Sequence, residues 1–301
     1  MAIDILLLGK GGQVGWELQR ALSPLGRLIA PELGECDLAN PDQLRTVIRA
    51  ARPAIIVNAA AYTAVDKAES EPDLVRAING LAPGIMAEEA KKLGAWLVYY
   101  STDYVFDGSK AGAHLEDDDP LPLSVYGATK LEGEQAIQQA NCCHLIFRTS
   151  WVFAARGDNF AKTILRLAHE RDALKIVDDQ FGAPTSAELL ADVTALCLRD
   201  VLRPGGEARQ GLYHLVADGE TNWYGYARFV LERAALSGIT LKCPAKNVVP
   251  IPTSAYPLPA KRPANSRLAT AKIKQEFGLY LPDWTYHAER MLTEILAKEG
   301  K

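Results

Sequence analysis

The sequence is poor in cysteine, has no excess of positive charge and contains no long apolar run. Five cysteines in 301 residues are few and odd in number, so a disulfide framework is not expected. The 33 lysines and arginines against 37 acidic residues give a formal charge of −4, which argues against a nucleic-acid partner. No apolar run approaches the roughly 20 residues that cross a bilayer, and the first residues lack the basic start of a secretory signal. We therefore expect a cytoplasmic protein without a membrane partner.

Metal-binding spacings are also missing from the sequence. Cys142 and Cys143 are adjacent, without the gap of about two to four residues that lets a turn present two thiolates to one zinc ion. The five histidines are scattered along the chain. What is present is an ordinary globular composition, with 48% hydrophobic and 23% charged residues. The length of 301 residues predicts two domains, at about 150 residues each, or one large domain.

The first half alternates short apolar segments with amphipathic ones. Asn40 and Pro41 are typical of the cap and the first position of a helix. Apolar strands separated by helices need cover on both faces, so the predicted fold class is α/β, with a Rossmann-type doubly wound parallel sheet. The expected strands span residues 3–8, 28–30, 54–58, 96–101 and 144–149, and the expected helices span 16–22, 42–51, 81–93 and 126–139.

The second half contains more proline-bearing turns and predicts a smaller α+β domain. The stretch 250–263 is rich in proline, and we expect an ordered excursion rather than a linker. We place the domain boundary near residue 150 and allow for segments of the second half that return to the first domain. Helices are expected at residues 159–170, 187–198, 223–235 and 286–297.

A glycine cluster between the first expected strand and helix indicates a dinucleotide site. Gly9 allows a tight turn at the strand end, Gly12 lets backbone N–H groups approach a pyrophosphate, and Gly15 allows the helix to pack closely on the sheet. The helix N-terminus adds partial positive charge for the phosphates. The small residues of 58–61 leave room for the cofactor at the same edge of the sheet. Residues 1–150 are therefore predicted to bind a dinucleotide, and 151–301 mainly to bind substrate.

The residues alone leave the phosphate state of the cofactor open. Glu32 and Asp37 both follow the glycines at about the distance of a carboxylate that meets the adenosine ribose. No lysine or arginine lies between residues 28 and 38 to accept a 2′-phosphate, although Lys10 and Arg20 are candidates to fold toward it. The pattern favours tolerance of NADH.

Tyr126 and Lys130 are four residues apart on an expected helix and so share one face. A nearby ammonium favours the phenolate and lowers the pKa of a phenol, which makes proton exchange possible at neutral pH. The strand that ends near Ser101 delivers a hydroxyl residue to the same edge of the sheet. We choose Thr102 as the group that polarises a carbonyl, with Ser101 in its place if the strand register differs by one residue.

The order of these motifs resembles that of the extended short-chain dehydrogenase/reductases, and within them the reductases of 4-keto deoxysugar nucleotides. The likeness covers nearly the whole chain. It implies reduction of the 4-keto group of dTDP-4-dehydro-L-rhamnose to dTDP-L-rhamnose by NADPH or NADH, for bacterial surface polysaccharide such as the O antigen of lipopolysaccharide. Beyond the shared motifs, it rests on residues 12–18, 63–69, 148–153, 179–185 and 262–268.

The resemblance also implies roles for the matching residues. As implied catalytic residues, Tyr126 donates the proton, Lys130 adjusts the pKa of Tyr126, and Thr102 hydrogen-bonds the developing oxyanion. Tyr62 stands where many relatives have histidine. The implied cofactor-binding positions are Gly9, Gly12, Gln13, Val14, Gly15, Asp37, Leu38, Ala61, Tyr62, Thr63, Tyr100, Tyr126 and Lys130. The implied substrate-binding positions are Thr102, Asp103, Tyr126 and Trp151.

Three further expectations follow from the resemblance. Arg262 and Arg267 are candidates to meet the substrate diphosphate, with an exposed solvated pair as the alternative. A homodimer is implied. Some members of the family use Mg²⁺ at a dimer interface, and the matching positions here are Glu17, Glu188 and Glu294, whose oxygen atoms suit that ion.

Two other functions are compatible with the same motifs. The beta subunit of methionine adenosyltransferase resembles this family, so one alternative is a non-catalytic regulatory subunit that binds a dinucleotide. The intact Tyr126 and Lys130 pair argues against it. The other alternative is a sugar-nucleotide epimerase or dehydratase of the same superfamily, and an epimerase recycles a tightly held NAD⁺.

Overall fold

The computed structural model describes residues 3–299 and contains a central six-stranded parallel sheet. The strand order is β10-β5-β4-β3-β1-β2, and all neighbouring pairs run parallel. The predicted doubly wound α/β fold is therefore confirmed. The strands span Ile3–Leu8 (β1), Gly26–Ile29 (β2), Ile55–Asn58 (β3), Trp96–Thr102 (β4), His144–Thr149 (β5) and Gly211–His214 (β10).

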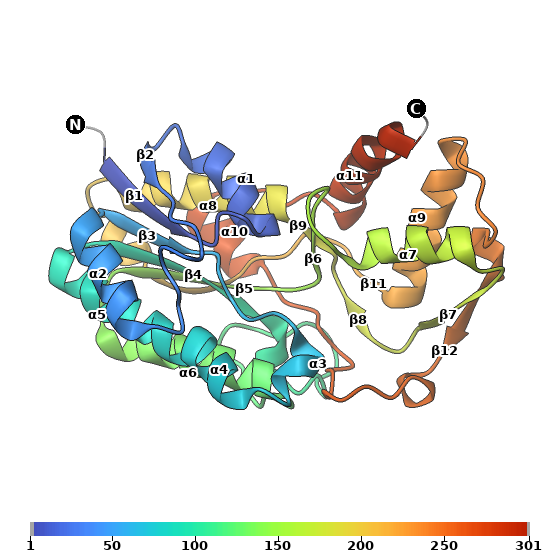
Figure 1. Ribbon diagram of the computed structural model, residues 1–301, viewed down its shortest axis with the longest axis horizontal. Helices are drawn as coiled ribbons and strands as arrows, with labels where there is room; N and C mark the ends of the chain where they lie inside the picture. Colours follow the sequence, from blue (N-terminus) through green and yellow to red (C-terminus); the bar gives the residue numbers. More distant parts are fainter. Residues whose placement is uncertain (1–2, 300–301) are drawn as a thin grey trace.

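Helices cover both faces of this sheet (Figure 1). Alternate residues of β1 point to opposite faces, and both sets are apolar. Ile5 and Leu7 join the core on one face of the sheet, whereas Leu6 and Leu8 join the core on the other. One layer contains α1 (Gln13–Leu22), α8 (Ala187–Val201) and α10 (Ala271–Phe277). The other contains α2 (Pro41–Ala51), α5 (Ala82–Leu93) and α6 (Val125–Ala140).

Local capping fixes several helix starts. The Asn40 side chain accepts a hydrogen bond from the Gln43 N–H, and Pro41 occupies the first helical position, so the predicted start of α2 is confirmed. Ser124 caps α6 in the same way, which places the Tyr126 side chain in the first turn. Between β3 and α5 the chain forms two short helices, α3 (Val65–Ala68) and α4 (Pro72–Arg76), and a π-helical turn at Ala77–Leu81, which the sequence pattern did not predict.

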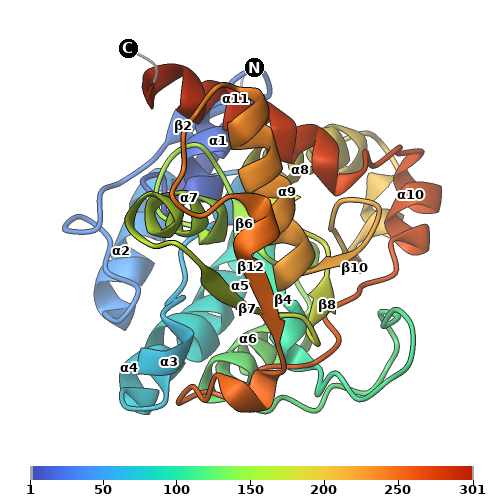
Figure 2. The same ribbon diagram turned by 90° about the vertical axis from the view of Figure 1, so that its right-hand side faces the viewer.

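The second half of the chain contributes to the sheet layer and also forms a separate lobe. Strand β10 and helices α8 and α10 belong to the sheet layer, a return that the sequence analysis had allowed for. The lobe is seen on the right of Figure 1 and faces the viewer in Figure 2. It contains α7 (Phe160–Glu170), α9 (Trp223–Leu236), α11 (Trp284–Glu299) and the parallel pair of β7 (Leu174–Val177) and β12 (Val248–Ile251).

Two very short strand pairs connect the sheet layer to this lobe, and neither was predicted. Strand β6 (Val152–Phe153) pairs with β9 (Thr185–Ser186), and β8 (Phe181–Gly182) pairs with β11 (Thr221–Asn222). Among the helices between residues 3 and 299, none combines the length and the apolar character that a membrane span requires. The predicted domain limits include residues 1, 2, 300 and 301, which lie outside the described residues.

Candidate active site

The glycine turn between β1 and α1 brings strand, helix and neighbouring loop into close contact. Gly9 has a φ of +85°, and a Cβ there would lie 2.6 Å from the Ala60 nitrogen. A Cβ on Gly15 would lie only 2.0 Å from the Gly9 carbonyl oxygen. At Gly11, by contrast, no atom between residues 3 and 299 would lie within 4 Å of an added Cβ. Of the three predicted positions, Gly9 and Gly15 are therefore required by backbone packing, whereas a Cβ on Gly12 would lie an ordinary 3.5 Å from the Gly9 carbonyl oxygen.

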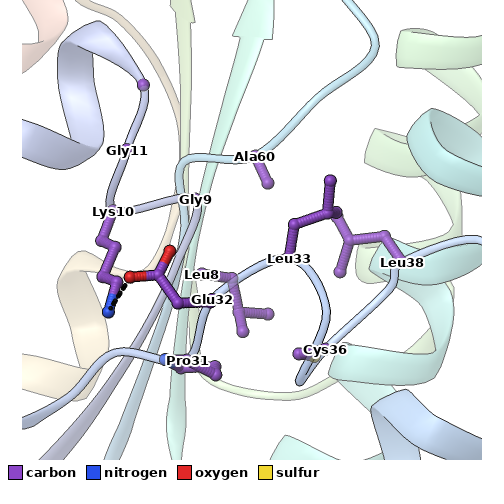
Figure 3. A pocket seen from close by; sticks show the side chains of 11 residues that line it. Leu8, Gly9, Lys10, Gly11, Pro31, Glu32, Leu33, Cys36, Leu38 and Ala60 are labelled. Atoms are coloured by element: carbon purple, nitrogen blue, oxygen red, sulfur yellow. Dashed lines mark ion pairs between the residues drawn. The ribbon is translucent and has the colours of Figure 1, made fainter.

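A cavity of about 230 Å³ adjoins this turn. Figure 3 shows Lys10 and Glu32 meeting at its edge, where the ammonium and the carboxylate are 2.8 Å apart. Asp37, the other acidic candidate, uses its carboxylate to accept the Ala39 N–H. The start of α1 at Gly12 carries no side-chain cap in the described chain, so its N–H groups are free for an anion. The cavity could hold the adenosine part of a dinucleotide and is lined by Leu8, Gly9, Lys10, Gly11, Gly12, Pro31, Glu32, Leu33, Cys36, Leu38 and Ala60.

The loop after β3 lies at the same edge of the sheet and holds the next predicted cofactor positions, Ala61, Tyr62 and Thr63. The Tyr62 N–H donates to the Asn79 side chain, and the Tyr62 hydroxyl donates to Glu71 at 2.6 Å. Gln13 accepts a hydrogen bond from Asn159, and Val14 follows it in the first turn of α1. These contacts order the loop and the helix start around the cavity.

Tyr126, Lys130 and Thr102 lie together where β4 meets α6. The Thr102 hydroxyl lies close enough to the Tyr126 phenol to lower its pKa, against the larger effect of burial. Lys130 is 2% exposed; it donates to the Tyr100 carbonyl at 2.5 Å and lies 3.9 Å from the centroid of the Tyr99 ring. The Tyr100 hydroxyl meets Thr194 of α8, so only its backbone faces Lys130. The structure therefore brings the three predicted catalytic residues to one place.

The strand register selects Thr102 over Ser101. Ser101 also lies on β4, but its hydroxyl is buried without a hydrogen-bond partner among residues 3–299. Because side chains alternate along a strand, the two hydroxyls point to opposite faces of the sheet. Thr102 is the hydroxyl residue that reaches Tyr126.

The expectation that Lys130 lowers the pKa of Tyr126 is wrong. Burial raises this pKa to about 12, although the nearby Thr102 hydroxyl works in the other direction. The neighbouring ammonium was expected to lower it, but Lys130 turns its ammonium toward the Tyr100 carbonyl. Tyr126 is therefore held as a neutral phenol at neutral pH, which is the form that donates a proton.

Burial lowers the pKa of Lys130 to about 7, and the charge of Glu134 partly opposes this effect. We expect the free energy of unfolding of the cofactor-free protein to rise with pH between about 7 and 10, relative to a Lys130→Met variant. In this window the unfolded lysine, with its ordinary pKa of 10.5, binds more protons than the folded one, so stability increases with pH. Below this window both states are protonated, so the difference between the two proteins is constant.

Urea unfolding at stepped pH values measures this difference. Its slope approaches about 1.4 kcal/mol per pH unit for one titrating group. A stability difference between wild type and Lys130→Met that stays constant across the window would show that Lys130 keeps an ordinary pKa.

Asp103 is almost fully buried directly after Thr102. Burial raises the pKa of its carboxyl to about 6, while hydrogen bonds from Ser266 and Thr102 lower it. The Thr102 hydroxyl donates to the Asp103 carboxyl at 3.1 Å. The two residues thus form one polar unit beside Tyr126.

Trp151 occupies a strained backbone position between β5 and β6. Its φ of +49° lies in the left-handed region, which bulky residues rarely adopt. Its indole stacks on that of Trp223, with ring centroids 3.7 Å apart. A Cβ on Gly182 would lie 2.9 Å from the Trp151 ring, so the glycine makes room for the stack. Trp223 also lines a larger cavity in the C-terminal lobe, whereas Trp151 is not among the residues that line it.

This second cavity, of about 930 Å³, lies in the C-terminal lobe and reaches Leu123, shortly before Tyr126. Much of its lining is apolar, including Phe160 and Ile251. Its cationic side chains include Arg171, Lys175 and Lys261, and none of these three forms an ion pair with a residue of the described chain. An apolar cavity with unpaired cations suits a ligand that has a flat apolar part and negative charge.

The two arginines suggested for the diphosphate both have protein partners. Arg262 lines the second cavity, but its guanidinium forms a two-point ion pair with Asp66 at 3.0 and 2.8 Å. Arg267 donates to Asn265 at 2.7 Å and lies 3.4 Å from Glu220. Neither forms an isolated solvated charge.

The three glutamates matched to a Mg²⁺ site do not assemble a ligand set within one chain. Glu188 pairs with His287 and Arg290, and these contacts lower its pKa to about 2. Burial raises the pKa of Glu17, and the negative charge of Glu188 raises it further. Glu294 lies on α11. Within residues 3–299, no group of three or more histidine, cysteine, aspartate or glutamate side chains is arranged to hold a metal ion. A single chain therefore does not fit this ion.

Sequence reasoning missed several residues of these sites. The cations Arg171, Lys175 and Lys261 are far apart in the chain and carry no motif. Trp223 directly follows the capping residue Asn222, a pattern typical of a helix start rather than of a binding site. The Lys10 and Glu32 pair had a partial signal, since both residues were considered separately for the ribose and its phosphate.

Comparisons with known proteins agree with this geometry. The family model described as RmlD substrate binding domain matches residues 3–297. The chain is 55% identical to a dTDP-4-dehydrorhamnose reductase of Escherichia coli K12, over 97% of this chain and 98% of the relative, and 46% identical to one of Burkholderia thailandensis, over 98% and 100%. The crystal structure of a dTDP-4-dehydrorhamnose reductase of Bacillus anthracis in complex with NADP is similar, with a TM-score of 0.87 and 32% identity over 99% of this chain and 100% of that one. The chain therefore belongs to the RmlD substrate binding domain family, together with these reductases.

Proposed function

We propose that this chain reduces the 4-keto group of dTDP-4-dehydro-L-rhamnose to give dTDP-L-rhamnose, with NADPH or NADH as the hydride donor. The observation that carries the proposal is the contact between Thr102 and Tyr126, one helical turn from the buried Lys130. The glycine cradle with its adjoining cavity supports the cofactor, and the names of the relatives support the substrate.

The reaction needs a proton donor and groups that stabilise negative charge on the sugar oxygen. The bound nicotinamide supplies a hydride to carbon 4 of the sugar. Thr102 is placed to hydrogen-bond the carbonyl oxygen, and the neutral Tyr126 hydroxyl donates the proton to it. Lys130, when charged, stabilises the phenolate that remains, because an opposite charge nearby favours an ionised group.

The second cavity is proposed to hold the nucleotide part of the substrate. The free cations Arg171, Lys175 and Lys261 supply charge for a diphosphate, and Trp223 supplies an aromatic face. Asp103 and Trp151 are proposed to contact the sugar at the junction with Tyr126. In this scheme residues 1–150 bind the dinucleotide, and residues 151–301 bind most of the sugar nucleotide.

The setting of the reaction is proposed from the resemblance alone. We place the protein in the cytoplasm, as a homodimer, in the synthesis of lipopolysaccharide O antigen. Mg²⁺ belongs to this proposal only at an interface between two copies, through Glu17, Glu188 and Glu294, and the residues proposed to act on the sugar do not include these three.

The test is the oxidation of NADPH and NADH by the purified chain, followed by the loss of reduced-nicotinamide absorbance. We expect turnover with the dTDP-4-keto sugar and none without it. A chain that binds the dinucleotide but turns over neither cofactor would support the regulatory-subunit alternative. Stoichiometric NAD⁺ retained through purification would support the epimerase alternative.

The same assay examines the second cavity. Lys175→Met removes one of its unpaired cations, so the KM for the sugar nucleotide should rise about 10-fold, the size of one charged contact, while kcat changes little. The matched control is Lys242→Met, which removes an exposed lysine outside this cavity. An equal rise in KM in Lys175→Met and Lys242→Met would mean that the positive charge of Lys175 acts on the substrate only at long range.

A further inference from the structure

A proline-rich segment, residues 252–263, crosses between the two parts of the molecule, and we call it the strap. In Figure 1 it runs from β12 in the C-terminal lobe toward α3 beside the sheet. Near its start, the Thr253 N–H and hydroxyl both donate to the Asp179 carboxylate, at 2.9 and 2.5 Å. Several strap residues, among them Tyr256 and Lys261, line the second cavity. The strap is thus one wall of the proposed substrate site.

The other end of the strap is held by Asp66 of α3. The Arg262 guanidinium donates to both Asp66 oxygens, at 3.0 and 2.8 Å, and also to the Ala260 carbonyl at 3.0 Å. Asp66 in turn accepts the Ala260 N–H at 3.2 Å. A two-point arginine–carboxylate pair fixes the plane of the guanidinium as well as its position. Two residues that are 196 positions apart in sequence therefore form one rigid clamp.

The clamp continues to the catalytic phenol through Tyr104. Burial raises the pKa of the Tyr104 hydroxyl, and the charge of the nearby Arg262 guanidinium opposes that rise, so the two groups interact. The ring of Tyr104 packs edge-on against that of Tyr126, with centroids 5.6 Å apart and planes at 81°. The Tyr104 N–H also donates to the Thr102 hydroxyl at 3.2 Å. Tyr104 thus touches both residues that are proposed to act on the sugar oxygen.

We propose that Arg262, held by Asp66, is a positioning residue for Tyr126 and acts through Tyr104. The guanidinium charge favours a Tyr104 position with the hydroxyl beside it, and the edge-on contact of the Tyr104 ring then limits the orientations open to the catalytic phenol. A displacement of about 1 Å in a reacting group lowers rates by as much as about 100-fold, so this control is large enough to matter. The inference rests on the reduction proposed above.

A purely structural role for the clamp predicts different kinetics from a positioning role. If the ion pair only stabilises the fold, its loss lowers the free energy of unfolding and leaves kcat per folded molecule unchanged. If Arg262 binds substrate directly, its loss raises the KM for the sugar nucleotide. If it positions Tyr126, its loss lowers kcat and leaves the Kd for NADPH unchanged.

The experiment compares Arg262→Met, Arg262→Lys, Asp66→Asn and Tyr104→Phe with the wild type, by steady-state kinetics and by fluorescence titration of NADPH. We expect Arg262→Met to lower kcat about 10- to 100-fold, with the Kd for NADPH within about twofold of wild type. Arg262→Lys keeps the charge without the two-point geometry and should restore only part of kcat. The matched control is Arg27→Met, because Arg27 forms a similar two-point pair with Asp4 between β1 and β2.

A double variant tests whether the effect passes through Tyr104. Tyr104→Phe keeps the ring and loses only the hydroxyl. It therefore still tests the positioning role if Arg262→Met does not fold. The kcat of the Tyr104→Phe/Arg262→Met protein should be no lower than that of the slower single variant, because both changes interrupt the same series of contacts from Arg262 to Tyr126. A wild-type kcat in Tyr104→Phe, a rise in KM alone in Arg262→Met, or additive effects would each overturn the inference. Absence of turnover in the wild type would reject the proposed reduction as well.

Discussion

Replacing Tyr126 with phenylalanine is expected to lower kcat by about 10²- to 10⁴-fold, the usual contribution of a positioned proton donor. The change removes one oxygen and keeps the ring, so the edge-on contact with Tyr104 remains. Thr102 loses the neighbouring phenol oxygen but keeps its hydrogen bond to Asp103, and Lys130 keeps its own partner, the Tyr100 carbonyl. The fold and the Kd for NADPH should therefore stay close to those of the wild type.

Steady-state turnover and NADPH titration on Tyr126→Phe measure this effect. The control is Tyr280→Phe, which removes the hydroxyl of a tyrosine that is 85% exposed. We expect wild-type turnover from the control. Turnover within about threefold of wild type in Tyr126→Phe would be too fast for loss of the proton donor, and the proton would then have to come from another group.

Replacing Gly15 with alanine is expected to abolish tight cofactor binding and to destabilise the fold. The new Cβ would lie 2.0 Å from the Gly9 carbonyl, and both partners are backbone that a rotamer change cannot move. Helix α1 must therefore shift away from β1. We expect a loss of about 1–3 kcal/mol in the free energy of unfolding, typical of overpacking, and about a 100-fold weaker Kd for NADPH, as two lost phosphate contacts would give.

Gly11→Ala is the matched control for stability, because it lies in the same turn and an added Cβ there would meet no described atom within 4 Å. Its free energy of unfolding should be nearly that of the wild type. Its Kd for NADPH is not a control, since Gly11 lines the cavity proposed for the cofactor. Fluorescence titration measures the Kd of Gly15→Ala against that of the wild type. Equal losses of stability in Gly11→Ala and Gly15→Ala, measured by urea unfolding, would mean that the close approach of helix and strand is not needed.

The features predicted well from sequence depend on neighbours along the chain. Asn40 and Pro41 predict the start of α2 because a cap acts within one turn. Tyr126 and Lys130 share a face of α6 because four residues make about one turn. Strand β10 was missed because four residues, Gly211–His214, are too short to show a reliable period.

The features that were missed depend on parts of the chain that are far apart. The Asp66 and Arg262 pair joins positions separated by 196 residues, and neither residue carries a local signal of the other. The pKa of Tyr126 was predicted in the wrong direction because helical spacing places Lys130 nearby but does not say where its ammonium points. That direction is set by the Tyr100 carbonyl on a neighbouring strand.

The return of the second half to the sheet has a consequence for how the protein forms during synthesis. Leu190 and Leu198 of α8 and Tyr213 of β10 share one core with Ile5 and Leu7 of β1. When the ribosome has made only the first 150 residues, that side of the nascent sheet lacks much of its apolar cover, and β5 is an unpaired edge. The first half therefore cannot complete its core ahead of the rest, and the emerging polypeptide depends on its later residues to bury this surface.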